Sequence, residues 1–244
     1  MAGGLIHEAA LVIVGERHGT NEFPALVSRL ATAGARHGPL IVAVELADDA
    51  RQPTADYVRS NGTVDDRTHM LSTASWQRQD GRASLAMLRL IEQLRKLTSE
   101  GANIDTDVFD VECPGGPDLG SFQNAREQLL AERLLTIRER GTTIVLTGNI
   151  HAELFARPDA PDDFVPAAAR ISRHTGLVTL VGRHSGGASW CTLPIDGRLV
   201  TAAHPVDGVD LGAETFVETE QSQSAHHGIA YVGRITPSPP ATTP

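Results

Sequence analysis

The 244-residue chain is long enough for one large or two small domains, and its 41% hydrophobic and 21% charged residues are ordinary for a globular protein. Thirty acidic against 21 basic residues give a net charge of -9 at pH 7, which argues against a nucleic-acid or anionic-membrane partner. Two cysteines exclude a disulfide framework, and no apolar run approaches the length of a membrane span. Because the N-terminus lacks the basic region of a signal peptide, we expect a cytoplasmic protein. The sequence does not predict the oligomeric state.

Strand and helix patterns alternate along the first half of the chain. The continuous apolar run Ala10 to Gly15 predicts a strand buried on both faces. A helix over Glu22 to Ala35 and a second buried strand over Pro39 to Leu46 follow. Ala50 to Gln79 is less regular and is expected to hold one or two helices, and Ser84 to Thr98 is a clear amphipathic helix.

The second half continues this alternation. It contains a third strand, a helix, a fourth strand, another helix and three closing strands, at Asp105 to Glu112, Gln123 to Arg140, Thr142 to Thr147, Pro166 to His174, Leu177 to Gly182, Ala188 to Pro194 and Gly228 to Thr236. The alternation predicts an α/β fold of a single domain, residues 1–236, with a central, mostly parallel sheet flanked by helices on both faces. The proline-rich tail, residues 237–244, is expected to be disordered.

Polar side chains follow four of these strands at the point where each strand ends. In parallel sheets the ligand crevice lies outside the carboxyl ends of the strands, so we expect these side chains to meet there. They are Glu16 and His18 after the first strand, Glu45 at the second, Asp110 and Glu112 at the third, and Asn149 and His151 at the fourth.

Two of these strand ends carry the same short pattern, Gly-x-x-His, in "GERH" and "GNIH". Alone the pattern is weak, because glycine often ends a strand and histidine often caps a helix. Its repetition, together with Glu45 inside an otherwise apolar strand, favours a site. A buried carboxylate needs a partner, and histidine or arginine would supply it.

Two further residues are more ambiguous. Arg126 lies on a helix face beside Leu129, Leu130 and Arg133, which is equally compatible with a surface salt bridge. His184, in "VGRHSGG", is kept as a possible substrate contact.

Several motifs, taken in order, resemble the erythromycin-esterase-like, ChaN and Tiki superfamily. They are "VGERHG", "VAVEL", "SWQRQDGRASLAML", "NAREQLLAERL", "VLTGNIHA" and "YVGRITPSPPA". The resemblance implies an α/β sandwich with a cleft above the Gly-x-x-His corners. By motif position it places the active-site histidines on His18 and His151, the glutamates on Glu16 and Glu45, and a helix arginine on Arg126.

Histidines and carboxylates at the edge of a sheet suit hydrolysis. A histidine takes a proton from water, and a neighbouring carboxylate orients it. No Gly-x-Ser-x-Gly elbow is present, so we expect direct water attack on an ester-like or amide-like bond of a small-molecule substrate. In this hypothesis His18 is the base, Glu45 orients it, and His151 with Arg126 stabilises the oxyanion. Substrate contacts are assigned to Asn149, Asp110 and His184, and no cofactor is favoured.

Two alternatives stay open. His18 and His151 with Glu16 or Glu45 form a donor set for a divalent metal, Mn or Zn, as the resemblance to the metal-dependent Tiki proteases allows. The resemblance to ChaN implies instead the binding of haem or a small molecule without turnover, for which Tyr57 and Tyr231 are the available phenolates. Substrate specificity is expected in Ala50 to Gln79 and in the loop Asp159 to Pro166.

Overall fold

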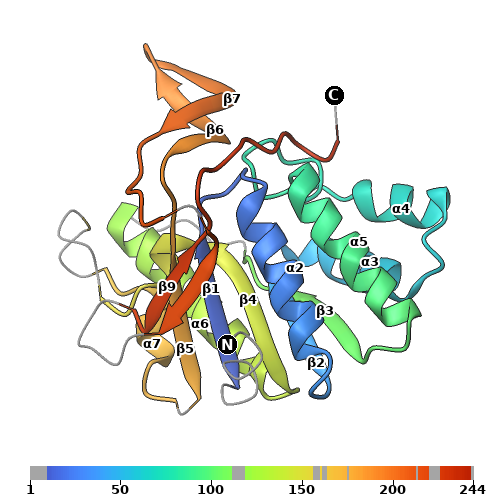
Figure 1. The fold of residues 1–244 in the computed structure, drawn as a ribbon. Helices are drawn as coiled ribbons and strands as arrows, with labels where there is room; N and C mark the ends of the chain where they lie inside the picture. The colour runs from blue at the N-terminus through green and yellow to red at the C-terminus, as the bar shows by residue number, and fades with distance from the viewer. Residues whose placement is uncertain are drawn as a thin grey trace.

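A computed structural model describes residues 10–111, 119–155, 160, 164–174, 176–212, 214–219 and 226–242. Its centre is a seven-stranded sheet in the order β3-β2-β4-β1-β5-β9-β8 (Figure 1). Every strand pair in it is parallel except the edge pair of β8 and β9. The predicted single α/β domain with a mostly parallel sheet is therefore confirmed. Glu112 and half of the loop Asp159 to Pro166 lie outside the described residues.

The strands agree with the apolar runs of the sequence. In sheet order they are β3 (Ile104–Val108), β2 (Leu40–Val44), β4 (Thr142–Gly148), β1 (Leu11–Glu16), β5 (Leu177–Arg183), β9 (Gly228–Tyr231) and β8 (Phe216–Thr219). Successive residues of β1 point to opposite faces, so Val12 and Val14 belong to one core cluster and Leu11 and Ile13 to the other. A core on each face explains why the run is apolar without alternation.

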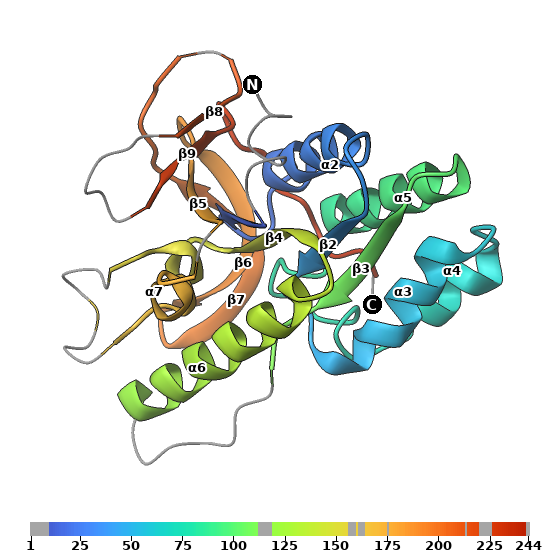
Figure 2. The same cartoon turned by 90° about the horizontal axis from the view of Figure 1, so that it is seen from below.

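Helices cover both faces of the sheet (Figure 2). One face carries α2 (Glu22–Gly34) and α5 (Leu85–Ser99), and the other carries α6 (Leu119–Arg138) and α7 (Ala167–Ile171). The irregular region forms the short helix η1 (Asp48–Ala50), α3 (Arg51–Arg59) and α4 (Val64–Leu71), with α3 packed on α5 and β3. Within the described ranges, no helix is both long and apolar enough to cross a membrane.

A β-hairpin extends the fold beyond the end of the sheet (Figure 1). It consists of β6 (Gly187–Ile195) and β7 (Arg198–Val206), paired antiparallel as a separate two-stranded sheet. Only the first of these strands was predicted from the sequence. The turn before the second has an Asp-Gly dipeptide, and Asp196 and Gly197 both have positive φ, as such a hairpin turn requires.

The prediction of a disordered tail is wrong for residues 237–242. Pro237 and Pro240 form bridges to Thr20 and Ser84, and Ser238 is buried. The first amide groups of α5 explain the packing, because a helix N-terminus has N–H groups without partners in the helix. Leu85 donates to the Pro239 carbonyl at 2.8 Å and Ala86 to Ser238 Oγ at 2.8 Å. Proline lacks a donor but keeps its acceptor, so a proline-rich segment can cap a helix.

Candidate active site

The strand order brings the predicted polar residues together. Strand β4 lies between β1 and β2, with Glu16 in register with Gly148 and Val44 in register with Leu146. The carboxyl ends of these strands are therefore adjacent. Glu45 follows β2, and the short helix η2 (Asn149–Ala152) carries His151 just past β4.

The glycine of each Gly-x-x-His corner is needed for close packing. A Cβ atom at Gly15 would lie 2.4 Å from Asn149 Oδ1. One at Gly148 would lie 3.0 Å from His18 Nε2. Each corner thus leaves room for a side chain of the other corner, which is why a side chain is absent at both positions.

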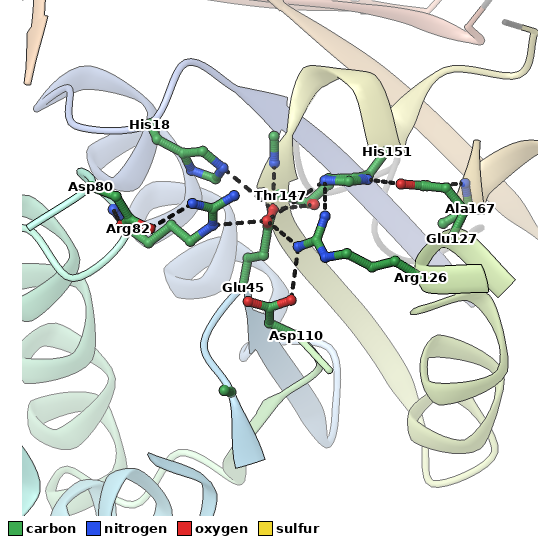
Figure 3. A network of polar contacts seen from close by, with 12 residues as sticks. His18, Glu45, Asp80, Arg82, Asp110, Arg126, Glu127, Thr147, His151 and Ala167 are labelled. Atoms are coloured by element: carbon green, nitrogen blue, oxygen red, sulfur yellow. Dashed lines mark hydrogen bonds and ion pairs between the residues drawn. The ribbon is translucent and has the colours of Figure 1, made fainter. Parts of the chain in front are cut away.

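Glu45 is the centre of the site (Figure 3). Its Oε2 accepts hydrogen bonds from Thr147 Oγ1 at 2.7 Å and from the Gly148 N–H at 2.8 Å. Its Oε1 accepts from Arg82 Nε at 3.0 Å and Arg126 Nη2 at 3.1 Å. Burial alone would raise the pKa of Glu45, but His18, His151 and Arg82 outweigh it and hold that pKa well below its usual range. The carboxylate is therefore ionised, as a buried acid surrounded by cations should be.

His18 lies between two carboxylates. Its Nδ1 is 2.8 Å from Glu16 Oε1 and its Nε2 is 3.4 Å from Glu45 Oε2. Burial lowers its pKa, yet the charge of Glu45 and the hydrogen bond to Glu16 raise the pKa to about 9. His18 is then an imidazolium at neutral pH, with both N–H groups directed at carboxylates. Glu16, rather than Glu45 as expected from the sequence, makes the closer contact.

His151 has a different environment. Its Nδ1 is 2.7 Å from Glu127 Oε1, although the angle of this contact does not meet that of a hydrogen bond. Glu127 is therefore the charged partner of Nδ1 by distance. Its Nε2 is 3.2 Å from Arg126 Nη1 and 3.6 Å from Glu45 Oε1. Because an arginine only donates, this contact makes Nε2 the acceptor and places the proton of a neutral ring on Nδ1, toward Glu127.

Arginines complete the site, and only Arg126 was expected from the sequence. Arg126 contacts Glu45, His151 and Asp110, the last at 2.8 Å, so it is not a surface salt bridge. Arg78 and Arg82 precede α5 in a segment without helical or strand periodicity. The sequence therefore does not predict where their side chains point. Arg78 Nη1 donates to Asp110 Oδ2 at 3.0 Å, and Arg82 Nη1 donates to Asp80 at 2.8 Å. Asp110 thus holds two arginines.

A cavity of about 720 Å³ opens above this network. Its lining includes His151, Arg82 and Arg126 together with apolar side chains of α6 and η2. This volume lies within the range of small-molecule sites, which is roughly 300–1,000 Å³. The cavity and the cluster of titratable groups therefore form one candidate active site.

Two residues assigned to substrate contacts, Asn149 and His184, form hydrogen bonds within the protein. The Asn149 side chain donates to the Gly182 carbonyl at 3.1 Å and accepts from the Gly182 N–H at 2.7 Å, so it ties β4 to β5. His184 Nδ1 accepts from the Gly186 N–H at 3.1 Å and does not belong to the cavity lining. The assignment of these two residues to substrate contacts stays a prediction.

The donor set does not suit a divalent metal. The Nε2 atoms of His18 and His151 both face Glu45, whose oxygens are already engaged by the cations Arg82 and Arg126. No group of three or more His, Cys, Asp or Glu side chains suited to a metal ion occurs within the described ranges. The two tyrosines considered for haem ligation donate hydrogen bonds elsewhere, Tyr57 to Glu92 and Tyr231 to Asp210, and neither lines this cavity.

Solved structures with the same architecture cover nearly the whole chain. A succinoglycan biosynthesis protein has a TM-score of 0.70 at 13% identity, over 97% of this chain and 90% of that chain. An erythromycin esterase variant in an open conformation has a TM-score of 0.68 at 11% identity, over 98% of this chain and 93% of that chain. The chain shares its fold with an erythromycin esterase. The resemblance expected from the motifs is thus confirmed at the level of the fold. No family model and no curated protein matches the sequence.

Proposed function

We propose that this protein hydrolyses an ester-like or amide-like bond by direct attack of water in the cavity above Glu45. The observation that carries the proposal is the placement of His151, which lines the cavity between a carboxylate on one ring nitrogen and an arginine on the other. That arrangement is typical of an oriented general base beside a group that stabilises negative charge. The shared fold with an erythromycin esterase supports the same class of reaction.

In this proposal His151 accepts the proton, in place of His18. His18 donates from both ring nitrogens to Glu16 and Glu45, and with a pKa of about 9 it holds its proton at neutral pH. A protonated imidazole cannot accept a proton from water. The lone pair of His151 Nε2 accepts a hydrogen bond from Arg126 in this structure, so the attacking water takes the place of that donor before Nε2 accepts its proton, and Glu127 stabilises the imidazolium that forms.

The reaction then proceeds in two steps. The water oxygen bonds to the carbonyl carbon of the substrate, the carbonyl electron pair moves to its oxygen, and the water proton passes to His151 Nε2. When the oxyanion collapses, the bond to the leaving alcohol or amine breaks, and His151 returns its proton to that group. The products are an acid and an alcohol or amine, and no covalent enzyme intermediate forms.

Arg82 and Arg126 stabilise the oxyanion. Both guanidinium groups line the cavity, and both are fixed by hydrogen bonds to Glu45 Oε1. Donors that are already oriented cost no reorganisation when charge develops, which is the main source of such stabilisation. His18 acts on Glu45 from the opposite side, so it positions this carboxylate and does not touch the substrate.

A panel of 4-nitrophenyl esters and 4-nitroanilides tests the proposal. We expect release of nitrophenolate or nitroaniline by the parent protein, in buffer containing EDTA, and a loss of roughly 10²–10⁴-fold in His151→Gln. His69→Gln, at an exposed position on α4, is the matched control and should retain the parent rate. Equal turnover by His151→Gln and parent, or no turnover of any compound by the parent, would contradict the proposal.

A further inference from the structure

The cavity has two chemically distinct walls. Arg78 and Arg82 come from the segment between α4 and α5 and form a cationic wall. Phe122 of α6, Ile150 of η2 and Phe164, just before α7, form an apolar wall. Since the whole chain carries a net charge of -9, a cluster of arginines in one cavity is a local feature that the overall composition does not explain.

The arginines of the cavity are more exposed than its acids. Asp110 and Glu127 also line the cavity, but the side chains of Arg78 and Arg82 are 34% and 23% exposed, whereas those of Asp110, Glu127 and Glu45 are 7%, 3% and 1% exposed. A ligand in the cavity therefore meets more guanidinium surface than carboxylate surface. Guanidinium groups bind carboxylates and phosphates through paired hydrogen bonds.

Arg78 is the arginine that the proposed chemistry leaves unused. Among the described residues its ion-pair partner is Asp110, through Nη1 alone, and a guanidinium has five N–H donors. Arg82 and Arg126 both bind Glu45, whereas among the described residues Arg78 forms no hydrogen bond or ion pair with Glu45 or His151, so it is not one of the groups assigned to the reacting carbonyl. Its exposed N–H groups are available to a second group on the substrate.

The apolar side chains of the cavity include an exposed one. Ile150 lines the cavity and is exposed, and Phe122 and Phe164 line the same cavity. Apolar side chains that line a cavity are typical of a binding site for an apolar ligand group.

We propose that the substrate is an amphiphilic anion, with an apolar group seated against Phe122, Ile150 and Phe164 and a carboxylate or phosphate bound by Arg78. This inference rests on the proposed hydrolytic function and names its substrate class. The scissile carbonyl lies between the two groups, over Arg82, Arg126 and His151.

A pair of chromogenic esters that differ in charge tests the inference by turnover. The mono-4-nitrophenyl ester of glutaric acid and 4-nitrophenyl pentanoate share the leaving group and the number of acyl carbons. We expect kcat/KM of the parent to be at least tenfold higher for the glutarate ester. Arg78→Gln should lower kcat/KM for the glutarate ester at least tenfold more than for the pentanoate, whereas Arg78→Lys, which keeps the charge, should be intermediate. Arg89→Gln, exposed on α5 outside the cavity, should keep the parent preference.

A binding measurement separates this inference from the hydrolytic proposal. Calorimetric titration with phenylacetate, phenyl phosphate and neutral phenylacetamide reports binding without turnover. We expect both anions, or one of them, to bind at least tenfold more tightly than the amide, and Arg78→Gln to remove the difference; the stronger anion identifies the charged group. Tight anion binding without ester turnover would contradict only the hydrolytic function. Equal binding of the anions and the amide, or an Arg78→Gln variant that keeps the preference while its melting temperature matches the parent, would overturn the inference.

Discussion

Glu127 Oε1 lies 2.7 Å from Nδ1 of His151, and the other oxygen of Glu127 accepts a hydrogen bond from the Ala167 N–H at 2.7 Å. One buried carboxylate thus connects the candidate base to the first residue of α7. The ring of His151 is held through Nδ1 by a carboxylate that also lines the cavity, and its Nε2 is directed toward Arg126 and Glu45.

Replacing Glu127 by Gln should impair catalysis more than folding. The amide is of similar size and keeps an acceptor for Ala167, but it cannot stabilise an imidazolium by charge. We expect kcat to fall by less than the roughly 10²–10⁴-fold that a lost base costs, with little change in the free energy of unfolding. Steady-state kinetics and urea denaturation of the variant measure the two effects, with Glu132→Gln, exposed on the same helix, as control. Unchanged kcat in Glu127→Gln would show that Glu127 has only a structural role.

The stability of the protein should fall at alkaline pH because of His18. A histidine whose pKa rises from about 6.5 to about 9 on folding adds stability that is fully present below pH 6.5. That contribution is lost as the pH rises through 9 and is at most roughly 3 kcal/mol. We expect the free energy of unfolding of the parent to fall between pH 6.5 and 9.5 more steeply than that of His18→Gln. Identical slopes for the two proteins would show that His18 is not stabilised as an imidazolium.

Glu45 should matter for both folding and activity. Glu45→Ala leaves Arg82, Arg126 and His18 without their shared buried partner. Removal of one member of a buried ion pair typically costs roughly 3–5 kcal/mol of stability. Glu45→Gln keeps the shape and one acceptor, so it should be less destabilised but still inactive, since the positions of both arginines depend on the charge. Denaturation curves and turnover of the two variants test this, and full activity of Glu45→Gln would contradict a positioning role.

Turnover should be independent of added metal. Arg82 and Arg126 surround the acid that a divalent ion would need, so chelation should leave the rate unchanged. Dialysis against EDTA, followed by titration with manganese or zinc while nitrophenolate release is recorded, measures the effect. A rate that disappears on dialysis and returns with either metal would favour the metal-dependent alternative and require a rearrangement of the arginines.

The fold was predictable because each face of the sheet leaves a distinct pattern in the sequence. β2 and the first four residues of β1 are apolar without alternation because both faces are covered, and the polar residue at the end of each strand marks the edge of the sheet. The same pattern predicts from the sequence that His18, Glu45 and His151 lie together at one edge of the sheet. The hairpin strand β7 was missed because it is largely exposed and contains Pro205, so it lacks a buried apolar pattern.

The remaining site residues could not be predicted, because their directions depend on tertiary structure. Glu127 follows Arg126 directly in α6, and its burial against His151 depends on the rotation of this helix over the sheet. Arg78 and Arg82 lie in a segment without periodicity, which gives no face to assign. The role proposed for His18 depends on its distances to Glu16 and Glu45. The sequence predicts that these residues are near one another, but it does not predict the distances.

The pH dependence of kcat/KM tests the central claim most directly, since it separates the two histidines as candidate bases. The substrate is the most active ester of the panel, with its spontaneous hydrolysis subtracted at each pH from 5 to 10. If His151 is the base and the His18 imidazolium supports Glu45, kcat/KM should decline as the pH passes about 9, and His18→Gln should lack that alkaline limb. If kcat/KM of the parent instead rises up to about pH 9 and His18→Gln abolishes the rise, His18 is the base and the assignment made here is wrong.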